Sequence, residues 1–204
     1  MPQYRLTAKM AAKLKITNLN KPPSNALPFY DDWVVDLDRY SRKETAIFMH
    51  VGTRIVLAVP IYEIGGIKEL FDCFPAVIEW GINELCIDGY EDFGSEIRNY
   101  FEPDINEVTF YKTDNRSVTT QLNQFKEVLA IDVLKAGHID HTICNKSSEY
   151  WQEALITNPH TKKEYTRPIK LWASYLSDDV IESESQDFTD NVLDFPAKRT
   201  RNDS

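Results

Sequence analysis

The stretch that decides the fold is WVVDLDRYSRKETAIFMHVGTRIVLAVP, residues 33–60. It is rich in β-branched and aromatic residues, and two short polar breaks divide it into three runs. This pattern predicts a meander of three antiparallel strands. The first break is residues 41–43, and the second centres on Gly52, which can supply the positive φ of a tight hairpin. Pro60 ends the third strand because it has no N–H for the ladder.

The third run, residues 55–59, is apolar on both faces, which predicts a central strand covered by helices. Two longer stretches predict those helices. Residues 67–85 have a broad apolar side that Pro75 should kink or split. Residues 118–133 form the clearest amphipathic pattern, with N-cap candidates in 113–117 before it and Gly137 at its exit.

Shorter elements complete the prediction. Thr7 is an N-cap candidate for a brief helix over residues 8–15, and residues 105–111 read as a further strand. Short helices are expected over 95–101 and 147–155. We therefore predict one α+β domain over residues 1–176, an antiparallel sheet of four or five strands with the meander at its centre and two main helices packed on it.

Residues 177–204 are predicted to be a disordered acidic tail, because the acids from Asp178 to Asp194 occur with no basic residue between them. The whole chain of 204 residues carries a net charge of −9. That charge argues against a nucleic-acid binder that works through its overall field, although a local basic patch is compatible with it. Three cysteines without close spacing fit a reducing compartment. No run is long enough to span a membrane, and no signal peptide is evident, so we expect a cytoplasmic location.

The sharpest metal-like pattern is His138-x-x-His141-x-x-Cys144, which places three potential zinc ligands within seven residues. A zinc site would need a fourth ligand or water, and a helix exit with a partly buried cysteine accounts for the same residues. We therefore predict no metal ligands and no cofactor. No nucleophile, base and acid are selected by a catalytic motif, so no catalytic residues are assigned either.

The candidate binding residues lie in three places. Arg116, between Asn115 and Ser117, starts a helix where a guanidinium and free N–H groups would face the same anion, unless the three simply cap the helix. Lys9 and Lys13 lie four residues apart in a start of the chain that holds no acid before Asp31, and the alternative for them is a solvated helix face.

Trp33, after the carboxylates of Asp31 and Asp32, completes the candidate binding residues. A second basic cluster interleaves His160, Lys162, Lys163, Arg167 and Lys170 with Tyr165 and Trp172. Its composition suits contacts to a nucleic-acid backbone combined with base stacking, but lysines beside core aromatics give the same string.

Several short segments occur in an order that is typical of one family. They are residues 6–9 (LTAK), 32–33 (DW), 41–43 (SRK) with 47–48 (IF), 107–113 (EVTFYKT) and 115–117 (NRS). The chain resembles, over about residues 3–130, the bacterial family called domain of unknown function 6933. Asp36 stands where the family pattern leads us to expect asparagine. The resemblance implies a small cytoplasmic bacterial protein and brings no activity or site residues.

These observations favour a non-enzymatic binding or interaction module whose partner the sequence does not identify, with the acidic tail as one route to another protein. The first alternative is recognition of nucleic acid or a nucleotide through Arg5, Lys9, Lys13 and Arg116. The second is a metal-dependent enzyme at His138, His141 and Cys144.

Overall fold

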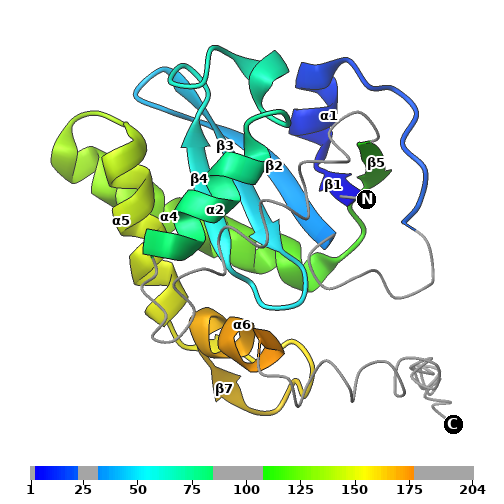
Figure 1. Cartoon of the computed structure of the whole chain (residues 1–204), viewed down its shortest axis with the longest axis vertical. Coiled ribbons are helices and arrows are strands. Elements are labelled where there is room, and N and C mark those ends of the chain that lie inside the picture. The colour runs from blue at the N-terminus through cyan, green and yellow to red at the C-terminus, as the bar shows by residue number, and fades with distance from the viewer. Residues whose placement is uncertain (1–2, 23–31, 85–107, 177–204) are drawn as a thin grey trace, which may run out of the picture.

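The computed structural model describes residues 3–22, 32–84 and 108–176 (Figure 1). A five-stranded sheet has the order β4-β3-β2-β1-β5, and β6 pairs with β7 in a small second sheet. The strands are β1 (Gln3–Leu6), β2 (Asp32–Tyr40), β3 (Lys43–His50), β4 (Val56–Pro60), β5 (Thr109–Lys112), β6 (Ile156–Thr157) and β7 (Tyr165–Thr166). The helices are α1 (Ala8–Leu14), η2 (Ile67–Glu69, a 3₁₀ turn), α2 (Phe74–Glu84), α4 (Arg116–Ala136), α5 (His141–Glu153) and α6 (Pro168–Leu176).

The predicted meander is confirmed, but it forms one side of the sheet and not its centre, and the sheet is mixed and not purely antiparallel. Strands β2, β3 and β4 pair antiparallel in sequence order, whereas β1 lies parallel to both β2 and β5. Parallel neighbours need a crossover connection, and α1 begins that connection after β1. Whether β1 runs parallel or antiparallel to its neighbours depends on this connection, and the four residues of β1 do not encode it.

Strand β4 is the last strand in the sheet order, so the prediction that it is central is wrong. All five of its residues are nevertheless buried. Helix α5 covers its outer side, where Trp151 Nε1 donates to the Arg54 carbonyl at 3.0 Å and Gln152 Nε2 donates to the Val56 carbonyl at 2.9 Å. Side chains of a helix thus satisfy carbonyl groups before and at the start of β4, on the edge where a further strand would pair. The strand is apolar on both faces because its alternate residues enter the two hydrophobic clusters that cover the sheet.

The two turns of the meander use positive φ at residues other than Gly52. Ser41 and Arg42 have φ of 47° and 69° between Tyr40 and Lys43, which pair directly. In the second turn Arg54 takes the positive φ of 67°, so the assignment to Gly52 is wrong. The turn is stabilised by His50, whose Nδ1 accepts the Thr53 N–H at 3.1 Å.

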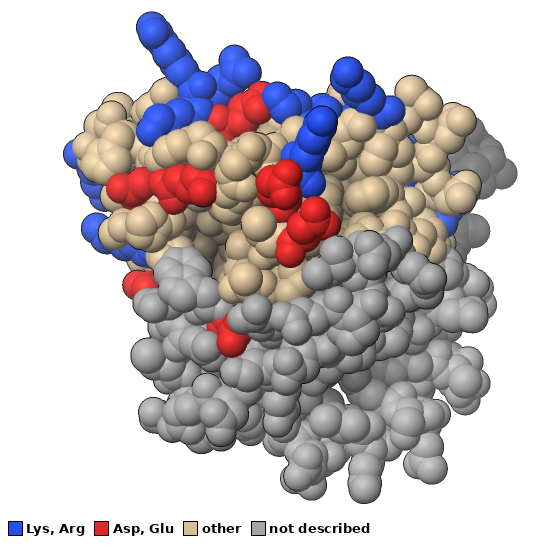
Figure 2. All heavy atoms as spheres, turned by 45° about the horizontal axis from the view of Figure 1, so that its top comes forward, with Lys and Arg blue, Asp and Glu red and all other residues tan. Residues whose placement is uncertain are grey.

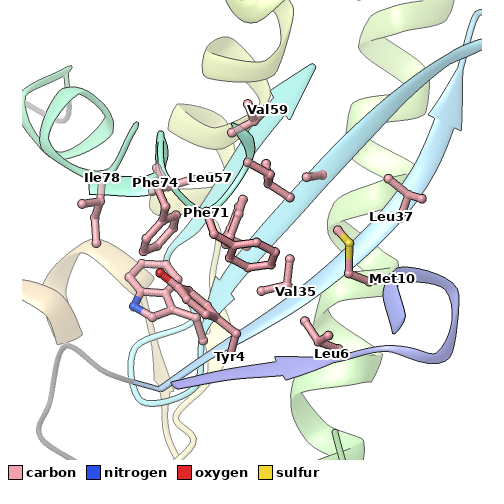
Figure 3. Close-up of a cluster of buried hydrophobic side chains, with 14 of the residues drawn as sticks. Tyr4, Leu6, Met10, Val35, Leu37, Leu57, Val59, Phe71, Phe74 and Ile78 are labelled. Atoms are coloured by element: carbon pink, nitrogen blue, oxygen red, sulfur yellow. The ribbon is translucent and has the colours of Figure 1, made fainter. Parts of the chain in front are cut away.

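Hydrophobic clusters cover both faces of the sheet, and Figure 3 shows one of them. On one face the side chains of β1, β2, β3 and β4 pack against α1, α2 and Trp172 of α6. Tyr4, Trp33, Phe48 and Phe74 make edge or tilted ring contacts there, with Phe48 and Phe74 centroids 4.5 Å apart. On the other face α4 and α5 pack on a second cluster. Figure 1 shows α2 in front of the sheet and α4 behind it.

The helix predictions agree well with the structure. Thr7 caps α1 and Asn115 caps α4, and Gly137 ends α4 with a left-handed φ of 77°. The pattern over 67–85 is split before Pro75 into η2 and α2, as expected. Helix α5 starts earlier than the predicted 147–155. The predicted helix 95–101 and the tail 177–204 lie outside the described residues, as does the first part of the predicted strand 105–111. None of the described helices combines the length and the apolar character needed to cross a membrane.

Candidate functional site

The carboxyl ends of β1 and β5 are the place where this topology favours a ligand site. The two strands are parallel neighbours, yet the helices that follow them lie on opposite faces of the sheet. Helix α1 follows β1 into one core cluster, and α4 follows β5 into the other. In open sheets, ligands bind where the connections from adjacent parallel strands diverge in this way.

A depression of about 440 Å³ opens beside this point, and side chains from the end of β5 and the start of α4 line it. They are Thr113, Asp114, Arg116, Thr119, Thr120 and Asn123. We call this depression the α4 pocket. Its lining combines one cation, one anion, one amide and three hydroxyl groups, so it offers both hydrogen-bond donors and acceptors.

Arg116 is the exposed cation of the α4 pocket. In the part of the chain that the structure describes, no carboxylate pairs with its guanidinium. Asn115 acts as the helix cap, because its side chain accepts the Val118 N–H at 3.2 Å. Ser117 is exposed in the first turn. Asn115 thus has the helix-capping role that was the alternative to anion binding. The guanidinium of Arg116 remains available to a ligand.

Arg5 is unavailable to nucleic acid because it is bound to acids on both sides. Its guanidinium holds Asp32 through two hydrogen bonds of 2.6 and 2.7 Å and reaches Asp114 of the α4 pocket at 3.1 Å. Burial raises the pKa of Asp32, and the hydrogen bond from Arg5 opposes that rise. Because Arg5 joins Asp32 of β2 to Asp114, it fixes one wall of the α4 pocket relative to the sheet.

Lys9 and Lys13 are also paired. Lys9 Nζ lies 3.4 Å from Asp38, and Lys13 Nζ lies 2.6 Å from Glu44. The hydrogen bond from Lys13 lowers the pKa of Glu44. Among the described residues no contact joins either lysine to Arg116. The four cations proposed for a nucleic-acid patch therefore do not form one free surface.

A buried polar cluster lies under the end of β1, on the α4 face of the sheet. Asp36, 3% exposed, accepts a hydrogen bond from Thr7 and forms an ion pair with Lys126 of α4. Lys126 also lies 3.8 Å from Asp38. Because Thr7 caps α1 with the same hydroxyl, this cluster ties α1, β2 and α4 together.

Trp33 does not fit the role of a binding residue, because it is fully buried. Its ring packs against Phe74 at 5.3 Å and Trp172 at 6.3 Å between centroids. Trp172, one of the two aromatic residues in the basic cluster predicted over residues 160–172, is equally buried and cannot stack on a base. The other, Tyr165, is 76% exposed.

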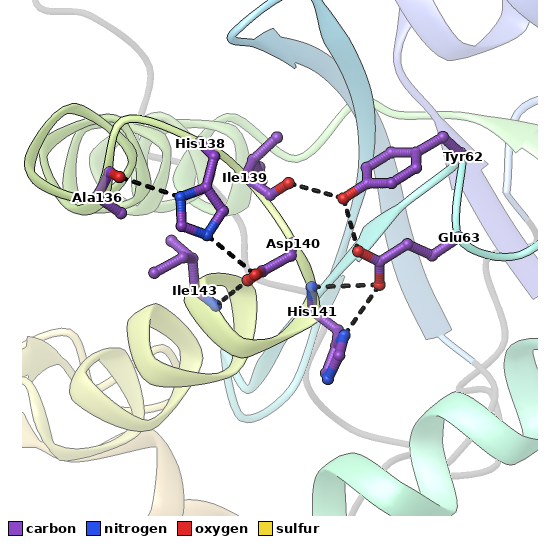
Figure 4. A network of polar contacts seen from close by, with 8 residues as sticks. All are labelled: Tyr62, Glu63, Ala136, His138, Ile139, Asp140, His141 and Ile143. Carbon is purple, nitrogen blue, oxygen red and sulfur yellow. Dashed lines mark hydrogen bonds and ion pairs between the residues drawn. The ribbon is translucent and has the colours of Figure 1, made fainter.

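The side chains of His138 and His141 each contact a different acid (Figure 4), and Cys144 lies in the core. His138 Nε2 contacts Asp140 at 3.1 Å, and His141 Nδ1 contacts Glu63 at 3.1 Å. Cys144 is fully buried, and burial raises the pKa of its thiol. Over residues 3–22, 32–84 and 108–176, no group of three or more acidic, histidine or cysteine side chains is placed to hold a metal ion. These residues therefore lie around the start of helix α5, and Cys144 belongs to the hydrophobic core.

The comparison with known families agrees with the resemblance and extends it. The family model described as domain of unknown function (DUF6933) matches residues 3–171. The chain belongs to the DUF6933 family. The match reaches from β1 into α6, beyond the 3–130 of the resemblance. No curated protein matches the chain significantly.

Sequence patterns alone do not predict two features of this DUF6933 protein, part of the lining of the α4 pocket and the buried pair of Asp36 and Lys126. Thr119, Thr120 and Asn123 enter the α4 pocket because they share the outer side of α4 with Arg116. The Asp36–Lys126 pair had a weak signal, since an aspartate stands within the apolar run of β2. Its partner is 90 residues away in sequence, and no local pattern predicts such a pair.

The polar network at the start of α5 predicts a pH effect on the stability of this DUF6933 protein. Asp140 caps α5 by accepting the Ile143 N–H at 2.9 Å, and this hydrogen bond, aided by His138, lowers the pKa of Asp140 below its ordinary value of 3.8. Because the pKa of Asp140 is lower in the folded protein than in the unfolded protein, the ionised carboxylate stabilises the fold at any pH above its pKa in the unfolded protein. This contribution is lost as the pH falls through the pKa of Asp140 in the folded protein.

Asp140→Asn keeps a capping side chain but removes the charge. The melting temperature of the natural protein should exceed that of Asp140→Asn at about pH 6, and the gap should shrink below about pH 4. Glu149→Gln, at an exposed position of the same helix, is the control and should show little difference. A gap that stays constant across this range would contradict the role of the Asp140 charge.

Proposed function

We propose that this DUF6933 protein is a non-enzymatic binding module that recognises a carboxylate or other anionic group of a partner protein in the α4 pocket. The observation that supports it best is Arg116, an exposed guanidinium without a counter-ion among the described residues, in a depression at the diverging ends of β1 and β5. A guanidinium matches the planar geometry of a carboxylate. A cytoplasmic location is part of the same proposal.

The rest of the pocket suits a polypeptide better than a bare ion. Asp114 and Asn123 supply acceptors beside the Arg116 donors, so peptide N–H and C=O groups would both find partners. The hydroxyls of Thr119 and Thr120 donate to the carbonyls of Asn115 and Arg116 at 3.0 and 2.9 Å. Their oxygens are left as acceptors, which favours a ligand that also carries donors.

Replacing Arg116 with alanine tests the proposal. A hydrogen-bonded charge pair contributes about 1.5–3 kcal/mol, so the affinity for the partner should fall roughly 10- to 100-fold. Partners would be isolated with the full chain, identified by mass spectrometry and measured again as purified proteins. A partner that is recovered with unchanged mass supports binding without chemistry.

Arg116→Lys is the informative second variant, because it keeps the charge and loses the planar fork. It should restore only part of the affinity. Lys135→Ala removes an exposed charge from the other end of α4 and should leave binding unchanged. Equal affinity of the natural protein and Arg116→Ala for every partner would refute the role of the pocket. Contact through the acidic residues 178–204 stays a separate prediction, because they lie outside the described residues.

A further inference from the structure

A second surface of the molecule carries a concentration of positive charge. We call it the basic rim, and it consists of Lys9, Lys13, Lys15, Arg39, Arg42 and Lys43. All six residues are exposed, in a chain whose net charge is −9. Figure 2 shows lysine and arginine side chains projecting along the upper edge of the molecule, with acidic side chains just below them.

Ion pairs join the parts of the basic rim that come from α1, β2 and β3. Glu44 binds Lys13 at 2.6 Å and Arg39 at 3.3 Å through its two oxygens. Asp38 binds Lys9 at 3.4 Å. These two acids hold α1 against the β2–β3 hairpin, and each of them neutralises one lysine of α1.

Three cations of the rim remain without such a partner. Over the described residues, Lys15, Arg42 and Lys43 form no ion pair, and Lys43 Nζ lies 3.8 Å from the centre of the Tyr62 ring. Among the described residues the rim therefore offers three cations without an ion pair, Lys15 at the end of α1 and Arg42 and Lys43 at the β2–β3 turn, on a framework that internal ion pairs hold in place.

The backbone at two of these cations is unfavourable for their side chains. Arg42 has φ of 69° in the β2–β3 turn, and Lys15 has φ of 60° at the end of α1. Glycine or asparagine is the residue of lowest energy at both kinds of position. A glycine at either position would therefore remove the charge without straining the backbone.

We propose that the basic rim is an interaction surface for an acidic segment of a partner protein. Three free cations match a few carboxylates, whereas nucleic-acid binding through phosphates commonly uses about 6–10 contacts. This surface is separate from the α4 pocket, and the inference does not depend on the function proposed for that pocket.

The test is an NMR titration of the full chain with a hexaglutamate peptide at low salt, with hexaglutamine as the uncharged comparison. Hexaglutamate should shift the amide signals of Lys15, Arg42 and Lys43, and its affinity should fall as salt is added. Hexaglutamine should shift none of them. Absence of hexaglutamate binding, or shifts confined to other surfaces, would overturn the proposal.

Arg42→Gly and Lys15→Gly separate the charge from the fold. Each removes a cation and relieves a positive φ, so the melting temperature should stay the same or rise by up to about 3 °C. Each should nevertheless weaken hexaglutamate binding about two- to fivefold. A loss of affinity accompanied by a large drop in melting temperature would indicate a structural role for the cation and count against the proposal.

Lys162→Gly is the matched control, because Lys162 is also an exposed cation with a positive φ, 56°, but lies in the β6–β7 turn. It should not change hexaglutamate binding. A single-stranded oligonucleotide of the same formal charge completes the set. If it binds more tightly than hexaglutamate and responds to the same variants, the rim serves nucleic acid and the proposed protein partner is wrong.

Discussion

Replacing Lys126 with alanine is expected to lower the free energy of unfolding by about 3–5 kcal/mol. Its amine forms an ion pair with Asp36, which is almost fully buried on the α4 side of the sheet. Alanine removes the cation and leaves this carboxylate in a site of low polarity, where an unpaired charge is costly. Urea denaturation of the purified natural and variant proteins at neutral pH measures the difference.

Two further variants show whether the loss comes from the buried charge. Lys135→Ala changes a lysine of the same helix whose side chain is 73% exposed and 3.9 Å from Asp132, and it should cost less than about 0.5 kcal/mol. The double variant Asp36→Asn with Lys126→Met makes the pair neutral and should recover most of the stability. A loss for Lys126→Ala as small as that for Lys135→Ala would show that the pair contributes little.

Trp172→Ala should have an effect of similar size, about 3–5 kcal/mol, because it empties the space of a fully buried aromatic side chain. The Trp172 ring meets His50 edge-on at 5.3 Å and lies 6.3 Å from Trp33. These contacts join α6 to the sheet, so amide hydrogen exchange in α6 should accelerate more than exchange in β3.

Tyr165→Ala is the control for this experiment. Tyr165 belongs to the same predicted basic and aromatic cluster, but its side chain is exposed, and its loss should change stability by no more than about 0.5 kcal/mol. If Trp172→Ala costs less than about 1 kcal/mol, the ring does not anchor α6, and the interpretation of Trp172 as a core residue is wrong.

The candidate site was predicted in part. The position of Arg116 at the start of an amphipathic helix is a local signal, and the structure places this residue in the α4 pocket. Lys9 and Lys13 also rest on a local signal, the absence of acids from the first thirty residues. Their partners Asp38 and Glu44 lie more than twenty residues further on, so the neutralisation of both lysines follows from the fold and from no local pattern.

Trp33 illustrates the same limit for hydrophobic residues. It follows two aspartates in sequence, Asp31 and Asp32, and this polar context suggests a binding residue. In the fold its ring points to the face of the sheet that α2 and α6 cover, while Asp32 points to the other face and binds Arg5. Alternation along β2 predicts that these two residues face opposite ways, but it does not say which face is covered.

The sequence by itself determined the meander β2–β3–β4 and the extent and caps of α1 and α4. These features follow from signals that act within a few residues: the alternation of apolar residues, their helical spacing, and the caps Asn115 and Gly137. Only the tertiary structure decided that β1 lies parallel between β2 and β5, that β4 is an edge covered by α5, and which cations remain free. These features arise from contacts between residues far apart in the chain, and their energies depend on burial and on neighbours that no local pattern specifies.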